Sequence, residues 1–153
     1  MFYCRNETVF KTPSVSSSDG YLNNAGYSFM KGELFVFGGS TDEYKIAKLV
    51  GCEFKEIEVK LLRHFRANTG TIQTTADHSE VFICFSWAVG MCQIFDGTSV
   101  VESSYRATHD HKYGCMGLYE DYIIAIGGYA GEKVEIYRPS GWENSIGSGF
   151  KSF

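Results

Sequence analysis

Apolar residues along the chain gather into short runs, and one kind of run occurs three times. Residues 34–37 (Leu-Phe-Val-Phe) are followed by a pair of glycines, and so are residues 123–126 (Ile-Ile-Ala-Ile). A third copy at residues 81–84 (Val-Phe-Ile-Cys) is followed by Phe85-Ser86 instead. The copies begin 47 and 42 residues apart. A period of this length is typical of a repeat protein.

The rest of each repeat also predicts short strands. A candidate strand precedes each run, at residues 25–30, 69–75 and 113–119. After each run, two large apolar residues stand five positions apart, which are Leu49 and Phe54, Phe95 and Val100, and Tyr137 and Trp142. An odd spacing would put both on opposite faces of one strand, so we expect a turn between them, made by Gly51, Gly97 and Gly141. No segment keeps a helical period over three turns, and residues 55–65 alternate as a strand would.

Four short strands in a unit of about 40–50 residues are typical of a β-propeller blade. The order of four apolar residues, Gly-Gly, Tyr and Trp resembles the kelch repeat. The third copy matches best, with Gly127, Gly128, Tyr137 and Trp142, and the first keeps Gly38 and Gly39. The resemblance implies an all-β fold of about three kelch-type blades, each of four antiparallel strands. In it these glycines and aromatics have a structural packing role.

The repeat also predicts boundaries. We expect an N-terminal segment at 1–24 as the remnant of a preceding blade, and blades at 25–62, 63–105 and 106–153, the last with a C-terminal tail. Propellers close with about 4–8 blades. Three blades therefore predict an incomplete propeller, which is part of a larger one, an incomplete gene product, or an assembly that closes by self-association.

Composition narrows the class of protein. Charged residues make up 21% of the chain and aromatic residues 16%, which argues against disorder. The formal net charge is −4 and there is no basic stripe, so we expect neither nucleic acid nor an anionic membrane as a partner. No apolar run reaches about 18 residues and no signal peptide is visible, so membrane insertion is not expected and the compartment stays open.

The five cysteines give one candidate pair. Cys84 and Cys92 lie on the two strands of one predicted hairpin. A symmetric three-residue loop, or a five-residue loop with offset register, would place them opposite each other, whereas a four-residue loop would separate them onto opposite faces. A disulfide and two small buried side chains both remain open. Cys115 is expected in the core, and no Cys-x-x-Cys pair suggests zinc.

Motifs for catalysis are scarce. There is no nucleophile elbow, phosphate-binding loop or dinucleotide fingerprint. His109 and His111 flank Asp110 and would share one face of an extended strand, but no third or fourth metal ligand is evident. Some kelch propellers are copper oxidases, and the Tyr/His ligand set of that chemistry cannot be assembled here. We therefore expect no catalytic residue, no metal and no cofactor.

The topology predicts a recognition surface. Loops after the second strand of each blade and connections before its first strand should lie on one face, which resembles the usual peptide-binding face of kelch propellers. The expected partner-binding residues are Asp42, Glu43, Arg63, His64, Arg66, Trp87, His109, His111 and Tyr129. Trp87 is the strongest candidate, because packing explains a Trp in a short loop least easily. We expect a module that binds a protein or peptide, without catalysis. The alternatives are a purely structural part of a larger propeller, and an oxidase or glycan-binding protein of the propeller class.

Overall fold

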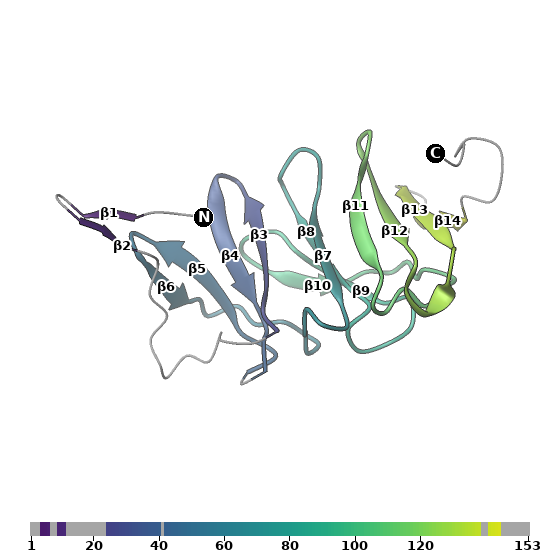
Figure 1. Cartoon of the computed structure of the whole chain (residues 1–153), viewed down its shortest axis with the longest axis horizontal. Coiled ribbons are helices and arrows are strands. Elements are labelled where there is room, and N and C mark those ends of the chain that lie inside the picture. Colours follow the sequence, from purple (N-terminus) through teal and green to yellow (C-terminus); the bar gives the residue numbers. More distant parts are fainter. Residues whose placement is uncertain (1–3, 7–8, 12–23, 41, 139–140, 145–153) are drawn as a thin grey trace.

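The computed structural model describes residues 4–6, 9–11, 24–40, 42–138 and 141–144, and it is all-β (Figure 1). Three antiparallel sheets have four strands each, and the strands of each sheet are neighbours in chain order. Sheet 1 contains β3 (Gly26–Met30), β4 (Glu33–Phe37), β5 (Ile46–Val50) and β6 (Glu53–Glu56). Sheet 2 contains β7 (Thr71–Thr74), β8 (Val81–Cys84), β9 (Cys92–Phe95) and β10 (Val100–Glu102). Sheet 3 contains β11 (Cys115–Tyr119), β12 (Tyr122–Ile126), β13 (Val134–Arg138) and β14 (Gly141–Asn144).

Two small elements complete the described chain. The strands β1 (Cys4–Asn6) and β2 (Val9–Lys11) form a separate two-stranded sheet, and η1 (Gly128–Ala130) is one turn of 3-10 helix. Within the described residues there is no α-helix, and no helix is long and apolar enough to cross a membrane. The prediction of an all-β chain built from four-stranded antiparallel units is therefore confirmed.

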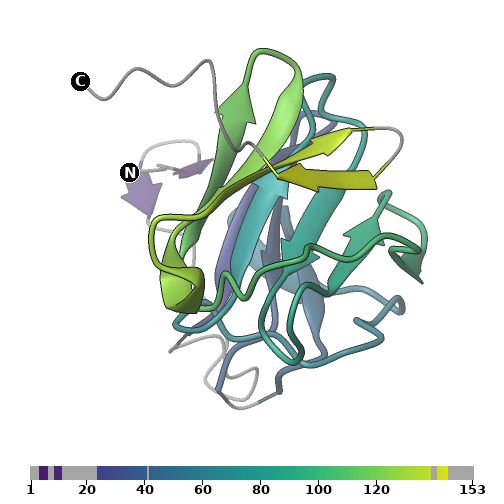
Figure 2. The same ribbon diagram turned by 90° about the vertical axis from the view of Figure 1, so that its right-hand side faces the viewer.

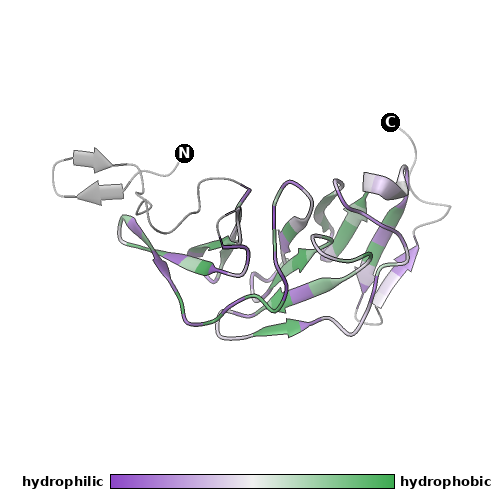
Figure 3. Ribbon diagram, turned by 90° about the horizontal axis from the view of Figure 1, so that it is seen from below, coloured by the Kyte–Doolittle hydropathy of each residue, from purple (hydrophilic) through white to green (hydrophobic). Residues whose placement is uncertain are grey.

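The three sheets follow one another in chain order and pack face to face (Figures 1 and 2). One buried cluster lies between sheets 1 and 2, where Phe35 and Phe37 of β4 meet Val81 and Ile83 of β8. A second cluster lies between sheets 2 and 3. Its members include Phe82 and Cys84 of β8, Cys92 of β9, and Ile123 and Ala125 of β12. Figure 3 shows hydrophobic residues concentrated along these strands. Because β8 is buried on both faces, its sequence is apolar at every position.

The ends of the three second strands share one backbone conformation. Gly38 and Gly127 have φ angles of 61° and 72°, and Phe85, at the equivalent place in sheet 2, has a φ of 65°. Each donates its N–H across the hairpin, to Lys45, Lys133 and Met91 respectively. The degraded copy of the repeat thus keeps the left-handed turn without the glycine.

Two aspartates hold turns between strands. In the turn from β7 to β8, Asp77 accepts hydrogen bonds from Thr75 and from the backbone and side chain of Ser79. These bonds lower the pKa of Asp77 to about 2. Asp96 accepts equivalent bonds from Thr98 and Ser99 in the turn from β9 to β10, and its pKa is lowered as well. Such side-chain bonds are a usual way to specify a tight turn.

The predicted strand character of residues 57–61 is wrong, because β6 ends at Glu56. The segment instead runs as a connection toward sheet 2. Its alternation persists because Ile57 and Val59 pack on the cluster between sheets 1 and 2, and Leu61 is buried in it. The alternation of apolar and polar residues here indicates an extended chain that packs on the core, rather than a β-strand paired within a sheet.

The first glycine pair lets this connection approach the sheet. Gly39 N donates to Phe65 O at 3.1 Å, and a Cβ atom on Gly38 would overlap the same carbonyl oxygen. Gly51 has nearly the same φ angle, 62°, but a Cβ there would meet no atom within 4 Å. At Gly51 only the left-handed backbone conformation favours glycine. At Gly38 the close approach of Phe65 O excludes a Cβ atom as well.

We expect Gly38→Ala to destabilise the protein more than Gly51→Ala. A left-handed alanine costs about 1–2 kcal/mol at either site. At Gly38 the overlap with Phe65 O adds the cost of moving the connection, so we expect a total of more than about 3 kcal/mol. Urea unfolding monitored by tryptophan fluorescence measures both values. Equal losses at the two sites would show that the close approach does not constrain the fold.

Candidate functional site

The loops that the topology assigned to one face are in contact with one another. The second strands end at Phe37, Cys84 and Ile126, and the loops that follow them meet the connections between sheets. Phe65 N donates to Glu43 O at 2.8 Å, and Ala107 N donates to Gly90 O at 2.9 Å. Tyr129 N donates to Lys112 O at 3.1 Å. We call these loops and connections, residues 38–40, 42–45, 57–70, 85–91, 103–114 and 127–133, the loop face.

Neighbouring connections are also bonded to each other. Ala67 N donates to Asn24 O at 2.7 Å, just before β3. Tyr113 N donates to Thr69 O at 3.0 Å, so the connection into sheet 3 is tied to the connection into sheet 2. The backbone of the loop face is therefore cross-linked from sheet 1 to sheet 3.

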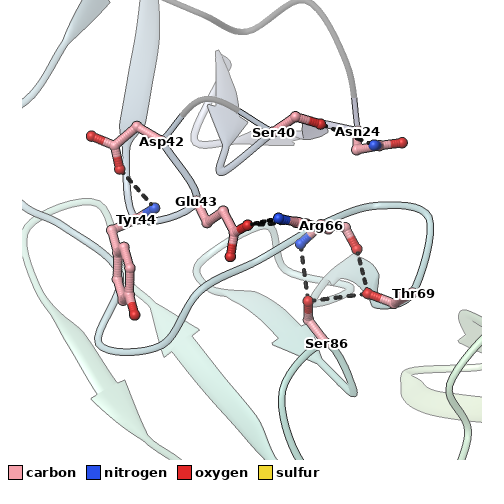
Figure 4. Close-up of polar contacts among 8 residues, drawn as sticks. All are labelled: Asn24, Ser40, Asp42, Glu43, Tyr44, Arg66, Thr69 and Ser86. Atoms are coloured by element: carbon pink, nitrogen blue, oxygen red, sulfur yellow. Dashed lines mark hydrogen bonds and ion pairs between the residues drawn. The ribbon is translucent and has the colours of Figure 1, made fainter.

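Arg66 and Glu43 form an ion pair on this face (Figure 4). The Arg66 Nε lies 2.5 Å from Glu43 Oε1, and its terminal nitrogen contacts the same oxygen. Arg66 N also donates to Ser86 Oγ at 2.9 Å, and Thr69 Oγ1 donates to Arg66 O at 3.2 Å. Since the Arg66 side chain is 47% exposed, the pair is open to solvent and to a partner.

The His109-Asp110-His111 segment is organised by a buried carboxylate on β13. Glu135 is fully buried, and its oxygens accept hydrogen bonds from Thr108 N at 2.8 Å and His109 N at 3.0 Å. His111 Nε2 lies 2.9 Å from Glu135 Oε2, and His111 Nδ1 lies 2.9 Å from Gly127 O. Both ring nitrogens of His111 thus lie within hydrogen-bond distance of an oxygen atom.

His111 is therefore not a contact residue, although the sequence placed it among the partner-binding residues. It is fully buried, between Glu135 and the end of β12, and its ring lies 5.3 Å from that of Phe85. His109 is partly exposed, and its Nδ1 lies 3.5 Å from Glu135 Oε2 without a hydrogen-bond partner. The cluster positions the connection into sheet 3 rather than presenting imidazoles to a ligand.

In sheet 2, a side-chain amide occupies the position that the Glu135 carboxylate occupies in sheet 3. Gln93 on β9 aligns with Glu135 in the repeat and is also fully buried. Its Oε1 accepts from Leu62 N at 3.0 Å and Arg63 N at 3.2 Å, and its Nε2 donates to Arg63 O at 2.9 Å. Sequence reasoning missed both residues. The available signal was a polar residue, two positions before Phe95 or Tyr137, inside an otherwise apolar strand.

Two exposed aromatic side chains of the loop face meet beside sheet 3. Tyr129 is 71% exposed and Tyr113 is 58% exposed, and their rings meet edge to face at 5.0 Å. A hydrogen bond with Tyr113 raises the pKa of the Tyr129 hydroxyl. Trp87 is partly exposed in the loop after β8. Tyr113 was assigned to the start of a strand, but it precedes β11 with a left-handed φ of 63°.

The other predicted contact residues are distributed along the connection into sheet 2 and the loop after β4. Arg63 is 53% exposed and lies 3.4 Å from Glu102. His64 is partly exposed and packs edge to face on Tyr44 at 6.4 Å. Asp42 accepts the Tyr44 N–H at 3.0 Å, which shapes the loop after β4.

A disulfide closes the loop that carries Trp87. Cys84 and Cys92 are direct partners across β8 and β9, and their sulfur atoms are bonded. Both are fully buried within the cluster between sheets 2 and 3. The core position expected for Cys115 is wrong, because this thiol is free and exposed on β11.

We expect the Glu135→Gln variant to be less stable than the unmodified protein by about 1–3 kcal/mol at pH 7. The amide replaces one acceptor oxygen by a donor, so at least one of three N–H groups loses its partner in a buried site. Urea unfolding measures this loss. Gln93→Glu is the reciprocal variant, and it should lose stability because a carboxylate would face the Arg63 carbonyl oxygen. If both exchanges were neutral, the bonds would not hold the connections.

The loss of stability in the Glu135→Gln variant should depend on pH. Burial raises the pKa of Glu135, but hydrogen bonds from His109, Thr108 and His111 outweigh it and lower the pKa from its ordinary 4.5. The carboxylate therefore stabilises the fold fully above about pH 4.5, and this contribution disappears as pH falls through the lowered value. The difference in unfolding free energy between the two proteins should shrink below pH 4.5. A constant difference down to pH 3 would contradict this assignment.

Neither a metal site nor a known relative indicates a function for the loop face. In the part of the chain that the structure describes, no group of three or more His, Cys, Asp or Glu side chains is placed to hold a metal ion. A comparison with protein-family models and with curated proteins finds no match for the chain. The geometry of the loop face is therefore the basis for a functional proposal.

Proposed function

We propose that the chain is a protein-binding module of the kelch type. In this proposal the three sheets are blades of a β-propeller, and a peptide or protein partner binds the loop face. The repeat of apolar run, left-handed turn and paired large residues supports the blade assignment. The order of the sheets and their face-to-face packing support it as well.

The observation that carries the proposal is the exposure of aromatic side chains on loops that are internally fixed. Tyr129 and Tyr113 present most of their surface to solvent, although the backbone beneath them is bonded to neighbouring connections. Tyr, Trp and Arg are the residues most enriched at the energetic centres of protein interfaces. Because the backbone of these loops is already fixed, less conformational entropy is lost when a partner binds.

Charge on the loop face favours a partner that carries carboxylates beside apolar residues. Arg63 and Arg66 are both about half exposed, and each is paired with a glutamate of the chain. Exposed ion pairs of this kind contribute little to stability, about 0–1 kcal/mol. A partner carboxylate can therefore replace the glutamate at low cost and use the bidentate geometry of the guanidinium.

Peptides selected on the purified protein from a random display library test the proposal. We expect selected peptides to be rich in aromatic and acidic residues, and we expect Tyr129→Ala and Trp87→Ala each to weaken their binding by about tenfold or more. Val101→Ala is the matched control, since Val101 is 54% exposed but lies on the outer strand β10. Fluorescence anisotropy with labelled peptides measures the affinities.

The melting temperatures of the variants show whether a loss of binding comes from a lost contact or from a loss of folding. Both loop-face variants should melt within about 2 °C of the unmodified protein, because Tyr129 is largely exposed, Trp87 is partly exposed, and neither belongs to a buried cluster of the described residues. Peptides that bind all variants equally, or a library that yields no binder, would contradict the proposal. Loss of folding in the Tyr129 and Trp87 variants would give these side chains a structural role instead.

A further inference from the structure

The two sheet–sheet contacts within the chain are of one type. Side chains alternate between the two faces of each strand, so every sheet has a back face toward the preceding sheet and a front face toward the next. The front faces in contact are formed by Phe35, Phe37 and Ile46 of sheet 1, and by Phe82, Cys84 and Cys92 of sheet 2. The back faces that receive them are formed by Val81, Ile83 and Phe95 of sheet 2, and by Ile123, Ala125 and Tyr137 of sheet 3. Each contact thus joins a front face to a back face.

The strand register shows that the two ends of the stack are also a back face, on sheet 1, and a front face, on sheet 3. On the back of sheet 1, Leu34, Val36 and Leu49 occupy the positions of Val81, Ile83 and Phe95 in sheet 2. On the front of sheet 3, Ile124, Ile126 and Val134 occupy the positions of Phe82, Cys84 and Cys92. Both sets are wholly apolar, yet neither belongs to the two buried clusters of the described residues. Leu34 and Ile124 are themselves buried, whereas Val36, Leu49, Val134 and Ile126 are partly or fully exposed.

The margins of these end faces are open to solvent. Tyr27 lies opposite Val36 on the back of sheet 1 and is 72% exposed. Ile126 lies on the front of sheet 3 and is 38% exposed. Sheets 1 and 3 lie at opposite ends of the stack (Figure 1), so within one chain the two faces cannot cover each other.

We propose that the front face of sheet 3 binds the back face of sheet 1 of a second copy of this chain. The argument is continuity, since the chain already contains two contacts that join equivalent front and back positions. The first strands add polar bonds across these contacts: the hydroxyl groups of Ser28 and Thr74 are hydrogen-bonded to each other, and Met116 N donates to Thr71 Oγ1. The two end faces differ from each other, so the association is head to tail. Such contacts generate a closed ring if the rotation permits it and an open filament if it does not.

Sedimentation velocity of the full chain over a range of concentrations tests this proposal. We expect the unmodified protein to form dimers or larger assemblies as its concentration rises. Tyr27→Lys alters only the back of sheet 1, and Ile126→Lys alters only the front of sheet 3. Each variant alone should weaken association by more than about tenfold, because a lysine ammonium would be buried without a partner.

Mixing the variants separates a head-to-tail contact from other modes. The Tyr27→Lys chain keeps an intact front face, and the Ile126→Lys chain keeps an intact back face. An equimolar mixture should therefore regain a dimer, although neither variant forms one alone. Ile126→Ser is a milder second variant, and circular dichroism should show the same strand content for all of them. An unmodified chain that stays monomeric would overturn the proposal, and so would association that only one of the two lysine variants disrupts.

Discussion

The structure depends on one constraint, which is that its sheets carry large apolar side chains on both faces. A four-stranded sheet of this kind is stable only when both faces are covered, and the second sheet is covered by the first and the third. Stacking in chain order follows, because each sheet is followed directly by the next. The up-and-down order of strands then sends every second-strand loop and every intersheet connection to the same end. The loop face is thus a consequence of burying the sheets.

The connections themselves have no ladder of hydrogen bonds, so other groups fix them. Gln93 and Glu135 place a buried polar side chain under the connections into sheets 2 and 3. Unsatisfied buried polar groups are costly, so each such side chain specifies the path of the backbone that pairs with it. The residues between these anchors can then expose aromatic and charged side chains without loss of order. In this arrangement the buried network supports recognition and the exposed residues perform it.

The strands could be predicted from the sequence, and their surroundings could be predicted only in part. Glycine pairs and short apolar runs locate the hairpins because turns and alternation are local properties. The burial of a given side chain depends on which sheet covers it, and this is not local. Cys115 was expected in the core but is exposed on the front of sheet 3, opposite Ile126. His111 was expected at the surface, but the carboxylate that buries it comes from a strand 24 residues later.

Amide hydrogen exchange of the full chain tests most directly the claim that side chains fix the connections. The account predicts slow exchange at the amides of Leu62, Arg63, Thr108 and His109, close to that of the paired strands. Exposed residues in the same connections, Asn68 and Arg106, should exchange much faster. Rapid exchange at all six amides would contradict the account, because the loop face would then have no fixed backbone on which to present its side chains.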